Sequence, residues 1–244
     1  MCGRFSQAYS WDEIVAFSQP LTVPANTPNL RARYNIAPTT EIDIIVRTDA
    51  GRELKKARWG LIPGWHKGNV KDFKLSTFNA RVETVETSGT FKHAYKSRRC
   101  IIPASGFFEW TGEKKDRVPH FFSAADGELL AFAGLWENWR DPETGEDITT
   151  CTMIVREANA WTAQFHDRMP CMLLRQDFEA WLDGSGGMEL LKQPPRELRE
   201  WIVSRRVNKA GEGDDDPTLV DPVEPKVEKL SEPPPKPPAQ GDLF

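Results

Sequence analysis

The sequence predicts an α+β fold, a single domain of mostly antiparallel, barrel-like β-sheets flanked by short helices. Strand-like runs follow one another through the middle of the chain, while helix signals occur near the ends and between strands. The regular alternation of strand and helix that is typical of a parallel sheet is missing. With 244 residues, of which 39% are hydrophobic, the chain is long enough to bury one substantial core.

The individual elements follow from local patterns. A helix over 11–17 is predicted because Ser10 can cap its first turn and Glu13, three residues on, can bond back to the cap. Two later stretches, 158–165 and 176–182, also have a helical pattern. Apolar runs, several of them bounded by Gly, Asp or Pro, predict six strands: 41–46, 99–104, 106–110, 120–124, 129–135 and 151–155.

The last part of the chain differs in composition from the rest. Residues 211–244 contain nine acidic residues and three lysines, and prolines cluster between Pro217 and Pro238. Such a segment has too few apolar residues to offset the entropy that is lost on ordering. We therefore expect one domain over 1–208 and an acidic, proline-rich disordered tail over 209–244. The tail is either a solvated appendage or a partner-binding peptide.

Composition argues against several classes of protein. No apolar run reaches the roughly 18 residues of a membrane-spanning helix, and the first residues lack the apolar centre of a signal peptide. We expect a cytoplasmic monomer with no membrane partner. The four cysteines are too scattered for a disulfide framework or a zinc site, and no phosphate-loop or dinucleotide fingerprint occurs. Neither a metal nor a cofactor is predicted. Residues 1–210 carry a net charge of +2, which permits a local nucleic-acid-binding patch without requiring one.

Cys2 is the residue with the most unusual chemistry. Removal of the initiator Met1, which is normal before a small residue, would give Cys2 both a free α-amine and a thiol. An α-amine has a pKa near 7.7–8.0, so roughly one in six is unprotonated at pH 7. A thiol is a strong nucleophile even when only a few per cent of it is ionised. Together the two groups can trap an aldehyde, first as an imine and then as a five-membered thiazolidine. The alternative is that a cysteine at this position is incidental.

Four further polar residues stand in settings that suit a reaction. Glu109 lies among aromatic residues in GFFEW, where burial would raise its pKa and suit it to proton transfer near neutral pH. His166, in HDRMP, can act as an acid or a base. Asn79 and Arg81 share one face of an extended segment and can present an amide to a reacting carbonyl and a guanidinium to a phosphate. The alternatives are an exposed strand glutamate, a capping histidine and a surface turn.

Basic and aromatic residues are interleaved in two segments, 58–67 and 91–99. This combination suits single-stranded nucleic acid, because its bases stack on rings while its phosphates meet cations. Packing in the core is the alternative for these rings. It is less favoured for Trp65, which follows a Pro-Gly turn.

Eight short motifs occur in an order and spacing that resemble the SOS response-associated peptidase family, whose members process abasic sites. They are MCGRF (1–5), RYNIAP (33–38), WGLIP (59–63), NARVET (79–84), RC (99–100), GFFEW (106–110), HDRMP (166–170) and VN (207–208). The resemblance spans about residues 2–208 and leaves out the tail. It implies that Cys2, freed of Met1, captures the ring-opened aldehyde of an abasic site in single-stranded DNA as a covalent thiazolidine. Such a crosslink shields the lesion from strand cleavage.

The resemblance also assigns chemical roles to individual residues. Glu109 would shuttle protons during imine formation and ring closure. His166 would protonate the sugar oxygen to open the ring, and Asn79 would orient the sugar. A thiol-type peptidase activity that removes Met1 is a further implication.

The DNA contacts that the resemblance implies are of two kinds. Arg4 and Arg81 would hold flanking phosphates, while Pro38 and Trp65 would pack against displaced bases. The chain departs from the family pattern around the site, so some of its contacts to DNA are expected to differ. The departures are His66, Arg156 and Cys171.

Two other functions stay open at this point. Glutamine amidotransferases with an N-terminal nucleophile also begin Met-Cys-Gly and use the α-amine of the cysteine as a base. Such an enzyme would need a partner synthase or a second domain to use the released ammonia. The second alternative is a non-catalytic binding module for damaged DNA, in which Cys2 is only structural. Glutaminase activity, or a DNA affinity that is independent of the thiol, would point to one of these.

Overall fold

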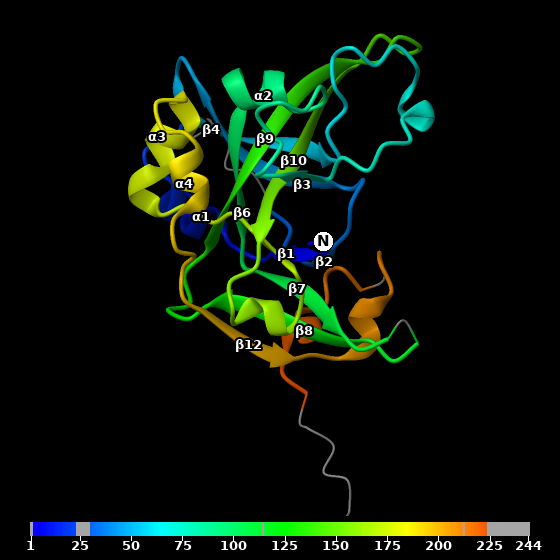
Figure 1. The fold of residues 1–244 in the computed structure, drawn as a ribbon, viewed down its shortest axis with the longest axis vertical. Helices are drawn as coiled ribbons and strands as arrows, with labels where there is room; N and C mark the ends of the chain where they lie inside the picture. Colours follow the sequence, from blue (N-terminus) through cyan, green and yellow to red (C-terminus); the bar gives the residue numbers. More distant parts are fainter. Residues whose placement is uncertain (1, 23–29, 114, 212, 224–244) are drawn as a thin grey trace, which may run out of the picture.

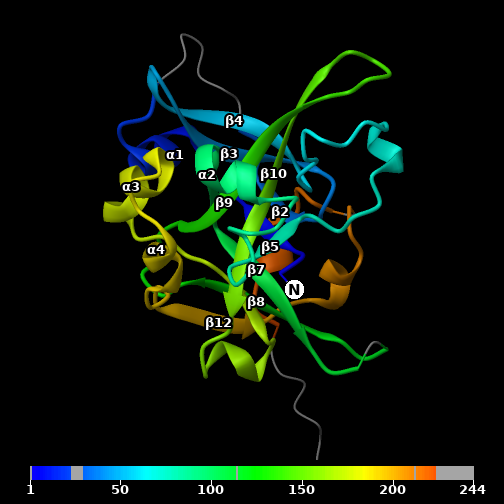
Figure 2. The ribbon, with the colours of Figure 1, turned by 45° about the horizontal axis from the view of Figure 1, so that its top comes forward.

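The computed structural model describes residues 2–22, 30–113, 115–211 and 213–223 of the chain. Its strands form two sheets, one of which contains a closed barrel. The short helices α1, α3 and α4 gather on one side of the strands (Figures 1 and 2). Among the described residues, no helix is both long enough and apolar enough to cross a membrane.

Five strands of the larger sheet close into a barrel. In order around it they are β10 (Asp147–Glu157), β4 (Gly51–Trp59), β3 (Glu41–Thr48), β6 (Arg99–Ala104) and β9 (Leu130–Arg140). The barrel closes because β9 pairs again with β10. Only the pairing of β10 with β4 is parallel within this ring. The predicted α+β class with mostly antiparallel, barrel-like sheets is therefore confirmed.

The smaller sheet is antiparallel throughout. Its strands lie in the order β12 (Leu198–Ile202), β8 (Val118–Ala124), β7 (Gly106–Thr111), β1 (Phe5–Gln7) and β2 (Arg33–Ile36). Strand β1 pairs with β7 through Phe5 and Phe107. Because the two strands are antiparallel, the residues just before β1 run alongside the part of β7 that carries Glu109.

Two three-residue strands complete the larger sheet and bring further polar residues to the same region. β5 (Asn79–Arg81) runs parallel to β10, with Asn79 opposite Met153. β11 (Arg168–Pro170) runs antiparallel to the same strand and begins at the last residue of the HDR segment, 166–168. The polar side chains of 79–81 and 166–168 are thereby carried by neighbours of one strand.

The helices are short and lie mostly where the sequence indicates them. α1 (Trp11–Ser18) has the predicted capping box, in which Ser10 accepts from the backbone N–H of Glu13 and the Glu13 carboxylate accepts from that of Ser10. The helix expected over 176–182 is α3 (Phe178–Asp183). The other α-helices are α2 (Lys92–Ser97) and α4 (Met188–Lys192), and the 3-10 turns are η1 (Val70–Asp72), η2 (Thr162–Gln164), η3 (Arg175–Asp177), η4 (Arg205–Asn208) and η5 (Pro217–Val220).

The helix predicted over 158–165 is wrong, because the structure has only the 3-10 turn η2 in this stretch. The Asn159 side chain accepts the N–H of Thr162 at 2.8 Å, and a side-chain bond of this kind favours a turn over a continuing helix. The ring of Phe165 then packs edge to face on Phe122, with ring centroids 5.1 Å apart. The turn delivers His166 to the start of β11.

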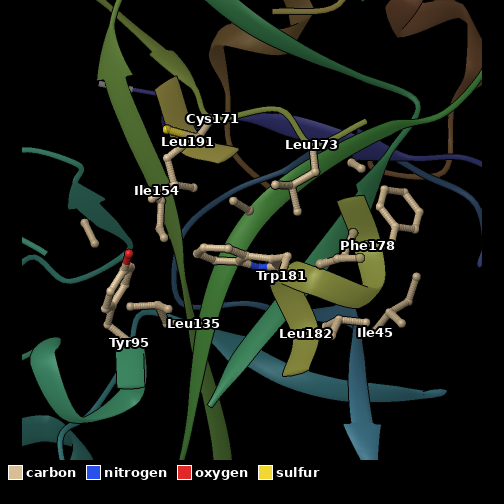
Figure 3. Packing of buried hydrophobic residues seen from close by; sticks show 14 of the residues in the cluster. Ile45, Tyr95, Leu135, Ile154, Cys171, Leu173, Phe178, Trp181, Leu182 and Leu191 are labelled. Atoms are coloured by element: carbon tan, nitrogen blue, oxygen red, sulfur yellow. The ribbon is translucent and has the colours of Figure 1, made fainter. Parts of the chain in front are cut away.

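The centre of strand β3, Ile44–Val46, is a continuous apolar run because both faces of the strand are buried there. Ile44 and Val46 belong to a buried cluster that includes residues of both sheets, while Ile45 belongs to a second cluster that includes residues of α1 and α3. The alternation of side chains thus buries both faces of the strand. Figure 3 shows the second cluster, where the ring of Trp181 from α3 lies among aliphatic side chains and its Nε1 donates to the Cys100 carbonyl at 2.9 Å.

Residues 213–223 pack against the body, although the sequence places them in the disordered tail. Turn η5 buries Leu219, which is 2% exposed, in a small apolar cluster. Acidic residues of the same stretch pair with arginines of the body. The ordered part therefore continues beyond the expected boundary at 208, because this stretch has both an apolar anchor and charges that match the surface it covers. Residues 224–244 of the expected tail lie outside the described residues.

Candidate active site

Cys2 is buried between the two sheets, with 1% of its surface exposed. Its carbonyl accepts a hydrogen bond from Nδ2 of Asn79 at 2.9 Å, and its thiol approaches the carbonyl of Arg168 at 3.8 Å. Burial raises the pKa of the thiol well above its ordinary value, and the carboxylate of Glu109 adds to that rise. The thiol is thus held in its protonated form until a base accepts the proton.

Glu109 is placed to be that base. Strand β7 holds it beside the chain that carries Cys2, and the residue is only 2% exposed, so it is not the exposed strand glutamate of the alternative interpretation. Burial raises its pKa to about 7, although the neighbouring Cys2 thiol favours the ionised form. A carboxyl that titrates near neutral pH can both give and accept a proton under physiological conditions.

His166 lies on the other side of this carboxyl. Its Nε2 is 4.0 Å from Oε2 of Glu109, and its side chain is 25% exposed. Nδ1 accepts the backbone N–H of Arg168 at 3.0 Å and also lies 2.9 Å from Oδ1 of Asp167, while Nε2 is the atom that faces Glu109. Burial lowers the pKa of His166 from its ordinary value. The imidazole is therefore mainly neutral at pH 7, with Nε2 facing Glu109.

Two buried oxygen atoms of the site have no hydrogen-bond partner among the described residues. They are Oδ1 of Asn79 and Oε1 of Glu109. Buried polar atoms are nearly always hydrogen-bonded in folded proteins, because an unmet hydrogen bond costs about 1–3 kcal/mol. Both atoms are therefore suited to receive hydrogen bonds from a ligand or from ordered water.

A cavity of about 590 Å³ opens at this place and is lined by Glu109 and His166. Its size falls within the range of ligand sites in proteins. Two rings, Phe78 and Trp110, the amide of Asn208 and four cations complete the side-chain lining. The cations are Arg4, Lys115, Arg117 and Arg205. A cavity surrounded by positive charge attracts an anionic ligand.

The structure brings only some of the predicted site residues together. Cys2, Asn79, Glu109 and His166 come together, and Arg4 lines the same cavity. The other predicted DNA-binding residues do not line it. Arg81 is exposed at the end of β5, and Pro38 is half-buried in the turn after β2. Trp65 has 53% of its surface exposed, and its Nε1 donates to the Gly89 carbonyl at 3.1 Å.

The three departures from the family pattern lie outside the cavity lining. Arg156 donates to the carbonyls of Leu191 and Gln193 next to α4, which ties the guanidinium to the body of the protein. His66 stacks at a tilt against Trp139. Cys171 is completely buried.

Several residues of the site are absent from the sequence-based prediction. Lys115 and Arg117 come from the β7–β8 connection and Arg205 from η4, and only the tertiary fold brings these segments together. Arg168 forms an ion pair with Glu83 at 2.5 Å, and its carbonyl faces the Cys2 thiol. For Arg168 a signal did exist, since it lies inside the HDRMP motif.

The fold and the site together are those of a small β-barrel protein with a buried cysteine next to a cation-lined cavity. A sequence model of the family described as SOS response associated peptidase (SRAP) matches residues 1–210, and the chain belongs to this family. Residues 213–223 lie beyond the matched part. The family that the eight motifs indicate is thereby confirmed.

Curated relatives and a solved structure agree with this assignment. The chain is 37% identical to "Abasic site processing protein YoqW" of Bacillus subtilis (strain 168), over 75% of this chain and 80% of that protein. It is 30% identical to "Abasic site processing protein YedK" of Escherichia coli (strain K12), over 75% and 79% of the two chains. A crystal structure of a Bacteroides thetaiotaomicron protein has the same fold, with a TM-score of 0.78 and 24% identity, and the match covers 91% of this chain and all of that one.

Proposed function

We propose that this protein processes abasic sites in DNA and, once Met1 has been removed, links Cys2 covalently to the lesion in single-stranded DNA. The observation that carries the proposal is the buried Cys2 thiol beside Glu109, a residue that lines the cation-lined cavity together with His166. Relatives that are named for abasic site processing support the choice of substrate. The crosslink would shield the damaged strand as part of the response to DNA damage.

The proposed reaction joins an aldehyde to an aminothiol. The α-amine of Cys2 adds to the carbonyl carbon of the ring-opened sugar, and loss of one water gives an imine. Sulfur then adds to the imine carbon while the thiol proton leaves through Glu109 and the nitrogen gains a proton. The products are a thiazolidine and water, with no change in oxidation state. The imine step is of the lyase type.

Each polar residue then has a distinct part in this reaction. Glu109 accepts the thiol proton and returns it to the nitrogen, which its pKa of about 7 permits in both directions. In its imidazolium form, His166 protonates the ring oxygen of the sugar from Nε2, which opens the ring and returns the imidazole to the neutral form that its lowered pKa favours. Asn79 fixes the Cys2 carbonyl through Nδ2 and offers its buried Oδ1 to a sugar hydroxyl.

The surroundings of the cavity suit a single strand. Arg4 and Arg81 are proposed to hold the phosphates that flank the lesion. Pro38 and the exposed Trp65 are proposed to pack against bases that have left the stack, which a single strand allows at low cost. All of these side chains belong to one chain, so a monomer suffices for the reaction.

A denaturing gel tests the covalent step. Protein with a free Cys2 amine is mixed with a single-stranded oligonucleotide that contains a natural abasic site, and a heat-stable adduct is expected. Cys2→Ser and protein with an uncleaved N-terminal extension should give none, since each lacks one of the two nucleophiles. Adduct formation by either of these proteins at the parental rate would refute the mechanism.

A self-processing step is a second part of the proposal. The same thiol and Glu109 are proposed to remove Met1 by peptide hydrolysis, as the family description suggests. In a cell-free translation system without methionine aminopeptidase, the parent chain should lose Met1 while Cys2→Ser keeps it. Retention of Met1 by both chains would assign its removal to another enzyme.

The two alternatives make different predictions. The amidotransferase interpretation is disfavoured because the chain belongs to the family of SOS response associated peptidases. Release of ammonia from glutamine by the purified protein would revive it. A non-catalytic damage-binding module would bind abasic DNA equally well with and without the thiol, and would leave no bonded product.

A further inference from the structure

The acidic segment 213–223, here named the C-terminal strap, contacts β2, the strand whose Asn35 binds the cavity residue Arg4. The backbone carbonyl of Asp214 accepts from the N–H of Tyr34 at 2.6 Å. Its carboxylate accepts from the N–H of Asn35 at 3.0 Å and from Nε of Arg33 at 2.5 Å. The strap thereby pairs with β2, which is the edge strand of the smaller sheet, at three consecutive residues.

Asn35 links the strap to Arg4. Its side chain is 1% exposed and lies between two partners, because Nδ2 donates to the carbonyl of Lys209 at 2.9 Å and Oδ1 accepts from Nη1 of Arg4 at 2.6 Å. Only one orientation of the amide satisfies a carbonyl on one side and a guanidinium on the other. The backbone of Asn35, which the strap holds, therefore sets where Oδ1 meets Arg4.

Arg4 is held by the same part of the chain from a second side. Its Nη1 also donates to the carbonyl of Val207 at 2.7 Å, and the guanidinium lies over the ring of Trp110, 5.7 Å from the ring centroid. Both of its hydrogen bonds to described residues leave from Nη1. Nε is buried, so Nη2 is the nitrogen that is left for a ligand in the cavity that Arg4 lines.

The strap is also attached to the body by contacts other than those with β2. Leu219 is buried in a cluster with Val207, the residue whose carbonyl holds Arg4. The carbonyl of Val220 accepts from Nε1 of Trp201 at 2.7 Å. Asp216 pairs with Arg206 at 2.5 Å. These contacts fix the strap and turn η4 together.

We propose that Asp214 is a positioning residue that holds Arg4 at the cavity for a DNA phosphate, through the backbone and side chain of Asn35. This inference rests on the proposed function, in which Arg4 binds a phosphate. The strap lies just beyond residues 1–210, the part of the chain that the family model matches.

Electrostatic competition with DNA is the opposite interpretation of the same acidic segment. The geometry argues against it, because both carboxylate oxygens of Asp214 are already engaged by β2 and the carboxylate is directly paired with Arg33. Asp215 provides a matched control. It lies one residue further on and carries the same charge, but it pairs only with the exposed Arg31, at 3.0 Å, and both side chains are well exposed.

Binding of a single-stranded oligonucleotide with a tetrahydrofuran abasic analogue separates the two interpretations, since this analogue has no aldehyde and forms no crosslink. Full-length Asp214→Asn should raise Kd by about three- to tenfold, as expected when a charge-assisted phosphate contact is weakened. The slope of log K against log salt should fall by about 0.7, the value for one phosphate of a single strand. Asp215→Asn should leave both quantities unchanged.

Two further variants exclude a general structural effect. Asp214→Glu keeps the charge but not the geometry and should also weaken binding, which keeps the test decisive should Asp214→Asn fail to fold. In an Arg4→Ala background, Asp214→Asn should cause no further loss, because the residue that it positions is gone. An equal loss in both backgrounds, or tighter binding by both Asp214→Asn and Asp215→Asn, would overturn the proposal.

The parent protein distinguishes failure of this inference from failure of the proposed function. If the parent forms an adduct with natural abasic DNA while Asp214→Asn binds the analogue like the parent, only the positioning role is refuted. If the parent forms no adduct but Asp214→Asn weakens binding as described, the positioning role is supported and the covalent chemistry fails.

Discussion

Glu109 should make the protein less stable as the pH rises, and Glu109→Gln should remove this effect. The carboxyl has a pKa of about 7 in the folded chain, against an ordinary value of 4.5. Folding therefore takes up a proton between these two values, and the unfolded state, which binds fewer protons there, is favoured as the pH rises. The contribution of Glu109 is fully present below about pH 4.5 and is lost as the pH passes about 7.

The magnitude follows from the pKa shift. A difference of 2.5 pKa units corresponds to about 3 kcal/mol at 1.36 kcal/mol per unit, as an order of magnitude for this buried group. Glu109→Gln keeps the shape of the side chain but does not titrate. Its free energy of unfolding, relative to that of the parent, should be higher at pH 8 than at pH 5 by about 2.5 kcal/mol.

Urea unfolding followed by tryptophan fluorescence measures this difference. Comparing variant with parent at each pH cancels the titration of all other groups. Glu113→Gln is the matched control, because Glu113 is an exposed glutamate in the same β7–β8 hairpin, and it should show the same small difference at both pH values. If the difference in free energy of unfolding between Glu109→Gln and the parent does not change with pH, the argument that burial raises the pKa of Glu109 is refuted.

Further predictions concern reaction and binding. The rate of adduct formation should depend on pH with an apparent pKa of about 7, rising as Glu109 ionises, and Glu109→Gln should lose this step in a pH–rate profile. Asn79→Ala should slow adduct formation roughly ten- to a hundredfold, because the Cys2 carbonyl loses its hydrogen bond. The affinity for the tetrahydrofuran analogue should not change. Weaker binding of the analogue with an unchanged rate of adduct formation would contradict this. Trp65→Ala should weaken binding about fivefold or more, whereas Trp161→Ala, also exposed but outside the two segments of interleaved basic and aromatic residues, should not. The slope of log K against log salt should lie between about −1 and −3 for a few phosphate contacts, and a slope near zero would exclude Arg4 and Arg81 as phosphate ligands.

The fold could be predicted where burial leaves a clear local pattern. The run around Ile44 and Ile45 is apolar at every position because both faces of β3 are covered, and the capping box at Ser10 marks the start of α1. The pattern over 158–165 misleads because Asn159 uses its side chain to begin a turn, which the apolar spacing does not reveal. A single side-chain hydrogen bond therefore decides between a helix and a turn in this stretch.

The chemical part of the site could be predicted, whereas most of its walls could not. Cys2, Glu109 and His166 lie in motifs whose residue types already indicate a reaction. Lys115 and Arg205 face one cavity only because a hairpin and turn η4 meet in the folded chain. That the strap is ordered could not be predicted for another reason. Its acidic composition is typical of a disordered tail, and the arginines of the body that neutralise it come close only in the folded chain.

Mass spectrometry of the crosslinked N-terminal peptide tests the central claim most directly. After digestion of the protein and of the DNA, the peptide that begins with Cys2 should carry the residual sugar fragment less one water, and its sulfur should resist alkylation without any prior reduction. A fragment attached to a lysine, or a Cys2 thiol that still alkylates in the adduct, would contradict the account.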